Sequence, residues 1–206
     1  STPYPTLFPY TTLFRSDKID REANRAGQVM RRLREFFRGG GLRPETFPVQ
    51  ELIEESLAHV RRRAERLGVT IETRLADDLP RVHADRVQMG TVLHNLLSNA
   101  VESLTDSPTL WRDIEIAAQA QGPDRVRLCV SDSGHGVAPD MENRLFDSFA
   151  TSKPEGMGLG LAISRTLVEA HGGQLWLDKA RPARFCFTLP TETDVGNPGA
   201  GSDKID

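Results

Sequence analysis

The most informative stretch of the chain is HNLLSNA at residues 94–100. It lies inside a predicted helix that Asp85 caps and that runs to about residue 104. Asn95 and Asn99 are four residues apart and therefore share one face of this helix, with the leucines between them available for a buried face. Neutral amide oxygens suit Mg²⁺, which keeps most of its water and phosphate ligands. Taken alone, however, the pattern is explained better by two asparagines on a solvated helix face than by a metal site.

Two glycine-rich stretches follow further along the chain. The first, DSGHGV at residues 132–137, comes directly after a predicted strand, where Asp132 can accept a hydrogen bond from an exocyclic amine such as that of adenine. The second, GMGLGL at residues 156–161, opens a predicted helix, and backbone N–H groups at a helix start attract phosphate. A dinucleotide-binding fold is disfavoured, because its glycine motif follows the first strand and this one comes late, after a long loop.

The order of these signals is more specific than any one of them. LFDSF at residues 145–149 and TSK at 151–153 lie between the glycine-rich stretches, and EAHGG follows at 169–173. With these motifs, residues 47–189 resemble the catalytic domain of sensor histidine kinases, in the ATP-binding superfamily that also contains gyrase, Hsp90 and MutL. The motifs correspond in turn to the family's asparagine box, first glycine box, phenylalanine box, lid lysine and second glycine box. The sequence looks most like the PAS-coupled kinases of the nitrogen-regulation and oxygen-sensing type.

The resemblance implies an ATP site in an α/β fold. The order of helices and strands itself indicates a two-layer sandwich, a mixed sheet with one layer of helices, and the resemblance makes this the Bergerat-type ATP-binding fold. It also implies that Asp132 binds the adenine amine, that Asn99 holds Mg²⁺, and that residues 133–157 form the ATP lid. Asn95 and Lys153 are expected to act in catalysis. The expected nucleotide contacts are Asn95, Asn99, Asp132, Gly134, Gly136, Val137, Phe149, Thr151, Lys153, Gly156, Gly158, Leu159, Gly160 and Leu161.

One position distinguishes kinases from ATPases in this superfamily. The ATPases usually carry a glutamate general base one helical turn before the metal-binding asparagine, and Asn95 stands at that place. We therefore expect transfer of the ATP γ-phosphoryl group to a histidine, and onward to the receiver domain of a response regulator, rather than hydrolysis. None of the five histidines precedes an acidic residue, as the family's acceptor typically does, so the acceptor is expected to be absent from this chain.

Two other functions are compatible with the same site: an ATP-holding module without turnover, and a serine kinase that regulates a sigma factor. Residues 21–38 speak against the serine kinase. Their apolar residues recur at spacings of three and four, which predicts a helix that packs against other helices. By resemblance this is the second helix of the dimerisation hairpin, which stand-alone serine kinases lack.

The chain divides into four predicted segments. Residues 1–16 have no periodicity and look like a translated sequencing adaptor, so they are excluded from the fold. Residues 17–41 hold the hairpin helix and the start of a hinge, 42–192 the catalytic domain, and 193–206 a disordered tail. The full-length parent is expected to be a homodimer, whereas half a hairpin predicts a monomer or weak association.

Periodicity predicts the elements of the catalytic domain. Helices are expected at residues 49–67, 85–104 and 159–170, with a short one in the lid near 141–149. Strands are expected at residues 69–75, 113–120, 125–131, 174–177 and 184–189. The prolines at 44 and 48 favour a hinge before the first of these helices.

Composition limits the remaining classes of function. The 26 Lys and Arg residues and 29 Asp and Glu residues leave a net charge of −3, which gives no global basic field for nucleic acid. No apolar stretch reaches the ~18 residues of a membrane span, and no signal peptide is visible. Cys129 and Cys186 lie in apolar runs and are predicted to be buried thiols rather than a disulfide or metal ligands, in a reducing, cytoplasmic setting. His135 and His171 are expected to be structural or solvent-facing.

Overall fold

The computed structural model describes residues 42–105, 111–151, 157–178 and 183–195. The chain separates into two units between Gly41 and Leu42, and all described residues belong to the second unit. The predicted adaptor segment and hairpin helix, and residues 196–206 of the predicted tail, lie outside the described residues.

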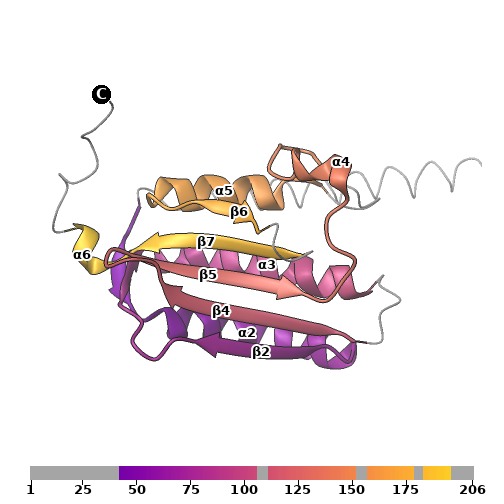
Figure 1. Ribbon diagram of the computed structural model, residues 1–206, viewed down its shortest axis with the longest axis horizontal. Helices are drawn as coiled ribbons and strands as arrows, with labels where there is room; N and C mark the ends of the chain where they lie inside the picture. Colours follow the sequence, from indigo (N-terminus) through magenta and orange to yellow (C-terminus); the bar gives the residue numbers. More distant parts are fainter. Residues whose placement is uncertain (1–41, 106–110, 152–156, 179–182, 196–206) are drawn as a thin grey trace, which may run out of the picture. The chain divides into compact units, whose positions relative to one another are not determined.

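A five-stranded mixed sheet forms one layer of the domain (Figure 1). β2 pairs with β4 in parallel, and the other neighbouring strands pair antiparallel. Every strand that the periodicity predicts is confirmed to within one residue at each end. The order across the sheet is β2 (Thr70–Leu75), β4 (Asp113–Ala120), β5 (Arg125–Asp132), β7 (Arg184–Pro190) and β6 (Leu175–Leu177).

Three helices, α2 (Val49–Arg66), α3 (Arg86–Thr105) and α5 (Gly160–Ala170), form the second layer. α3 is central, because it contacts α2 and α5 as well as β5. Ile114 and Ile116 of β4 and Val126 of β5 are completely buried and alternate with more exposed neighbours, as expected where one face of a strand is against helices. The predicted two-layer α/β sandwich is confirmed.

Local signals account for the beginning of α3. Asp85 Oδ1 accepts a hydrogen bond from the backbone N–H of Gln88 at 3.1 Å, which confirms Asp85 as the N-cap. Arg86, the first residue of the helix, forms ion pairs with Glu55 at 2.6 Å and Glu51 at 2.8 Å, both on α2. The hydrogen bond to Glu55 raises the pKa of Arg86, burial opposes this, and the hydrogen bond to Glu51 adds to it.

α2 begins after Pro48, which is in an extended conformation, and ends before Gly68. The φ of Gly68 is +64°, the left-handed conformation that commonly terminates a helix. Among the helices of the described ranges, none combines the length and apolar character that crossing a membrane requires.

The structure differs from the predicted elements at three places. β1 (Glu45–Phe47) and β3 (Val82–Ala84) pair antiparallel in a second, two-stranded sheet, whereas the sequence predicts only a hinge around β1 and no element at β3. Two strands of three residues, far apart in the sequence, are too short to show a period. The lid helix α4 is Pro139–Glu142 rather than residues 141–149. The helix α6 (Glu192–Val195) shows that the predicted disordered tail is wrong for residues 193–195.

His171 joins the end of α5 to the start of α3. Its Nε2 accepts a hydrogen bond from the Asp85 N–H at 3.1 Å, and its Nδ1 donates to the Leu167 carbonyl at 2.7 Å. His171 therefore has a structural role, one of the two alternatives that the sequence predicts for it. His135 is exposed, with its Nδ1 2.9 Å from the Gly136 carbonyl oxygen.

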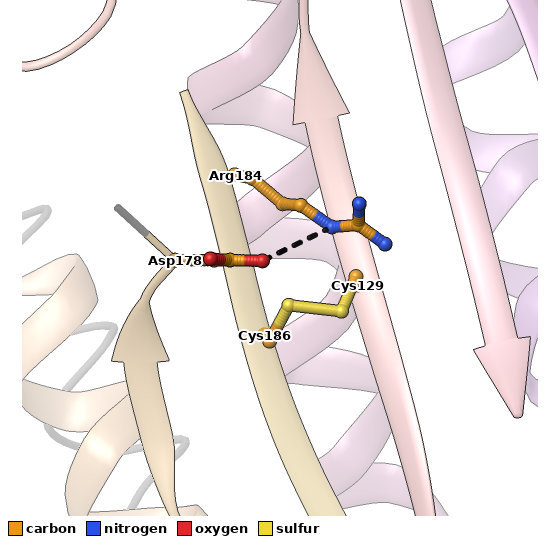
Figure 2. The surroundings of a disulfide bond; sticks show 4 residues. All are labelled: Cys129, Asp178, Arg184 and Cys186. Atoms are coloured by element: carbon orange, nitrogen blue, oxygen red, sulfur yellow. Dashed lines mark ion pairs between the residues drawn. A yellow bond between two sulfur atoms is a disulfide. The ribbon is translucent and has the colours of Figure 1, made fainter. Parts of the chain in front are cut away.

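Cys129 and Cys186 form a disulfide, so the prediction of free thiols is wrong (Figure 2). Both are buried as predicted, but they lie directly opposite each other on β5 and β7. Only this strand register brings together two residues that are 57 apart in the sequence. Beside the disulfide, Arg184 of β7 forms an ion pair with Asp178 at 3.8 Å.

Candidate nucleotide-binding site

One face of α3 carries three polar side chains in succession. Asn95, Asn99 and Ser103 are each four residues apart, and all three are partly buried. The row from Asn95 to Ser103 spans eight residues and is therefore about 12 Å long along the helix axis. Asn95 contacts α5 at one end of this row, and Ser103 contacts the end of β5 at the other. The predicted pair of asparagines therefore belongs to a longer row that connects two parts of the domain.

Asp132, the last residue of β5, lies at the Ser103 end of this row. Its Oδ1 accepts a hydrogen bond from the Ser103 hydroxyl at 3.0 Å and another from the Gly134 N–H at 2.9 Å. A Cβ on Gly134 would overlap Ser103 Oγ and would lie 2.7 Å from Asp132 Oδ1. Asp132 and Gly134, both predicted site residues, are thus brought together, and only glycine fits beside the carboxylate.

The start of α5 lies against Asn95 at the other end of the row. A Cβ on Gly160 would overlap the Asn95 Oδ1, so the backbone of α5 passes directly over this amide. The amide Nδ2 donates to the hydroxyl of Ser164 at 3.0 Å, and Ser164 is 2% exposed. Leu159 is buried at the helix start, and Leu161 is partly buried in the first turn. The predicted contacts Asn95 and Gly160 therefore adjoin, at the helix end that attracts phosphate.

A backbone hydrogen bond joins Phe149, inside the predicted lid, to Gly158, the residue that follows the predicted lid. The Phe149 N–H donates to the Gly158 carbonyl at 3.0 Å. Both residues have positive φ, +69° for Phe149 and +63° for Gly158, and a Cβ on Gly158 would overlap the Phe149 carbonyl carbon. Phe149 keeps this left-handed conformation although it is not glycine, and its side chain is 73% exposed. Earlier in the predicted lid, the Phe146 ring lies 5.3 Å from the Arg165 guanidinium on α5.

The remaining predicted contacts have less defined surroundings. Gly136 has a φ of +75°, and the neighbouring Val137 is partly buried. Thr151 is exposed. Lys153 and Gly156 lie outside the described residues, so their predicted roles remain predictions.

The polar groups along α3 fit a magnesium nucleotide. Asn95 and Asn99 supply neutral amide oxygens, the type of ligand that Mg²⁺ accepts when phosphates and water complete its shell. In the described part of the chain, no group of three or more His, Cys, Asp or Glu side chains could form a metal cage of its own. Two neutral amide oxygens suit a metal ion that the phosphates of a nucleotide also bind.

The residues that form this site lie within a single known family domain. A profile described as histidine kinase-, DNA gyrase B-, and HSP90-like ATPase matches residues 84–193, which is more than half of the chain. The chain belongs to this family. The matched residues of this ATPase-family domain include α3, β5 and α5, which carry the amides, the carboxylate and the glycine-rich helix start.

Individual relatives of the ATPase-family domain are sensor proteins and histidine kinases. The sensor protein FixL of Bradyrhizobium diazoefficiens is 38% identical over 176 residues, which cover 84% of this chain and 34% of FixL. The chain thus spans about a third of the length of this relative. The nucleotide-free catalytic domain of histidine kinase ThkA has a TM-score of 0.64 and 28% identity, covering 72% of this chain and 98% of that domain. Full-length ShkA in complex with AMPPNP has a TM-score of 0.68 and 28% identity, covering 88% of this chain and 38% of ShkA.

Two serines of the ATPase-family domain are not among the predicted site residues. Ser103 continues the four-residue spacing of Asn95 and Asn99, so the sequence contains a signal for it. Ser164 lies one turn after Gly160, and nothing local indicates that its hydroxyl meets Asn95. Its contact arises only from the packing of α5 on α3.

We expect the substitution Gly160→Ala to impair the site while leaving the domain folded. The new Cβ would displace the end of the Asn95 side chain, which can rotate, and break its hydrogen bond to Ser164. The free energy of unfolding should change by less than about 1 kcal/mol, because the better helix propensity of alanine offsets the lost bond. Affinity for a magnesium ATP analogue should fall about tenfold or more.

The matched control for this substitution is Gly90→Ala. Gly90 is in the middle of α3, and a Cβ there would make an ordinary contact with Leu52 at 3.9 Å. This variant should bind nucleotide like the parent. Equal affinities of the Gly160→Ala variant and the parent, measured by calorimetry, would contradict the role assigned to Asn95.

Proposed function

We propose that this domain is the ATP-binding kinase unit of a sensor histidine kinase. In this proposal it transfers the γ-phosphoryl group of ATP to a histidine outside the chain, from which a response-regulator receiver domain takes it. The observation that supports transfer most directly is the arrangement around Asn95. This residue stands where related ATPases carry a glutamate base, and its amide donates to Ser164 and packs closely against the backbone at Gly160.

The chemistry at Asn95 favours transfer over hydrolysis. An amide cannot take a proton from water at neutral pH, so no base is present at this position to activate a water molecule. A positioned histidine needs no such activation by this residue, since phosphoryl transfer depends mainly on alignment and on charge stabilisation. Asn95 would therefore orient the triphosphate and its metal ion rather than move protons.

The other residues would each contact a different part of the nucleotide. Asp132 would accept the adenine amine, and the N–H groups at the start of α5 would face the phosphates. Asn99, with Asn95, would hold Mg²⁺, which neutralises charge on the phosphate oxygens when bound. Lys153 would add a positive charge from the lid.

The wider assignments rest on the resemblance and on the relatives. We propose that the full-length parent is a homodimer, that its dimerisation hairpin supplies the acceptor histidine, and that it acts in the cytoplasm. A disulfide is uncommon in that compartment, so the redox state of Cys129 and Cys186 bears on the last point.

One alternative function has an observation in its favour. None of the five histidines is followed by an acidic residue, so the chain alone has no acceptor of the kind that the family uses. In isolation it would then bind ATP without turning it over.

A two-part experiment tests the proposal on the full 206-residue chain. First, calorimetric titration with AMPPNP should show binding that Mg²⁺ strengthens. Second, the chain should transfer labelled phosphate from ATP to a separately supplied dimerisation hairpin, and not to the same hairpin with its histidine changed to glutamine. A folded chain that binds no nucleotide would overturn the proposal, and binding without transfer would favour the alternative.

A further inference from the structure

We propose that Ser103 is a positioning residue that orients Asp132 and so sets the preference of the site for adenine. The inference rests on the proposed function, because it concerns the same nucleotide site. It adds a residue that lies outside the motifs of the family resemblance.

The hydrogen bond of Ser103 departs from the default for a hydroxyl in a helix. Among the other hydroxyls on α3, Thr91 and Thr105 donate to the carbonyls of Val87 and Val101, four residues earlier, at 3.0 Å, and Ser98 pairs with His94 Nε2 on the same helix at 3.4 Å. Ser103 instead donates across to Asp132 Oδ1 at 3.0 Å. Its hydroxyl therefore links the central helix to the end of β5.

The Asp132 carboxylate is held from two directions at the same oxygen. The Gly134 N–H comes from the loop that follows the strand, and the Ser103 hydroxyl comes from α3. Each donor to a carboxylate restricts rotation about its terminal torsion, whose energy profile is otherwise broad. Two donors on Oδ1 limit this rotation and fix the direction of the whole carboxylate, including its second oxygen.

This orientation has a chemical consequence for base selection. A fixed carboxylate accepts a hydrogen bond from the exocyclic amine of adenine, and it repels the carbonyl oxygen that hypoxanthine has at the same ring position. If the carboxylate is less restricted, its contact with the adenine amine weakens, whereas a base without the amine has no such contact to lose. The presence of Ser103 should therefore affect affinity for adenine nucleotides selectively.

The test uses Ser103→Ala in the full chain, with AMPPNP and its inosine counterpart as ligands in the presence of Mg²⁺. We expect the affinity for AMPPNP to fall about five- to twentyfold, from the loss of one hydrogen bond to a charged group. The affinity for the inosine analogue should stay within about twofold, so the discrimination between the bases shrinks. In an Asp132→Ala background, measured by competition, the same substitution should change AMPPNP affinity by less than about twofold.

Thr105→Ala is the matched control, because it removes a hydroxyl from the same helix without touching Asp132. It should bind both nucleotides like the parent, and thermal unfolding without nucleotide should show that all variants are folded. If the parent and the Ser103→Ala variant bind AMPPNP equally well, the role of Ser103 is overturned, and the proposed function is not affected. Equal losses for both analogues, or a further loss in the Asp132→Ala background, would likewise overturn the role of Ser103 in favour of a general structural role. A folded parent without nucleotide binding would overturn the proposed function, and the Ser103 inference with it.

Discussion

Replacement of Asp132 by alanine is expected to weaken binding of AMPPNP by about a hundredfold, because a hydrogen bond to a charged acceptor contributes about 1.5–3 kcal/mol. The carboxylate lies at the end of β5, where Ser103 and Gly134 direct it by two hydrogen bonds. In the proposed site it is the group that recognises the adenine amine. Calorimetric titration of the full chain, with circular dichroism to verify folding, measures the effect.

Asp132→Asn separates the recognition of adenine from the local structure. Its amide oxygen can still accept from Ser103 and Gly134, which leaves the amide NH₂ where the adenine amine needs an acceptor. We expect this variant to be as stable as the parent and to bind nearly as weakly as Asp132→Ala. Asp140→Ala, an exposed acidic residue of α4, is the control for a general change of charge and should have no effect. Affinity at the parental level in Asp132→Asn would contradict the assignment of the adenine contact.

Removal of the disulfide is expected to lower the free energy of unfolding more than any of the other substitutions proposed above. A cross-link between residues 57 apart restricts the unfolded chain, which on the chain-entropy model is worth about 4 kcal/mol. Whole domains unfold with free energies of only about 5–15 kcal/mol, so this is a large share. The Cys129→Ala, Cys186→Ala double variant should therefore unfold at a much lower urea concentration than the oxidised parent.

The parent refolded in the presence of dithiothreitol provides the comparison for this variant. Its urea midpoint should shift towards that of the double variant, whereas reductant should not move the midpoint of the variant itself. Nucleotide affinity of the folded variant should match the parent, because neither cysteine takes part in the site contacts around Asp132. Two titratable thiols in the denatured parent, purified without reductant, would contradict the disulfide.

The elements with strong local signals are those that the sequence predicts correctly. Asp85 supplies its side-chain cap within three residues of the N–H that it binds, and Gly68 supplies the conformation that ends α2. β4 shows a period of two in its burial because one of its faces is against helices. β1 and β3 have three residues each and pair across 37 positions of sequence at Thr46 and His83, so no local period reveals them.

The features of the site also separate into those that local sequence predicts and those that depend on tertiary packing. Sequence spacing alone predicts that Asn95 and Asn99 share a helix face, that Asp132 ends a strand, and that Gly160 lies at a helix start, because each of these facts depends on neighbours within a few residues. Which groups meet across the domain depended on the packing of α5 on α3 and on the register of β5 with β7.

Those tertiary contacts decided what the spacing could not. They place the Ser164 hydroxyl on the Asn95 amide and the Ser103 hydroxyl on the Asp132 carboxylate. They also join Cys129 to Cys186. The sequence around a hydroxyl or a thiol does not indicate which distant residue it will contact. Many arrangements of the same helices and strands satisfy the same local periods, and only the packing of the core selects one of them.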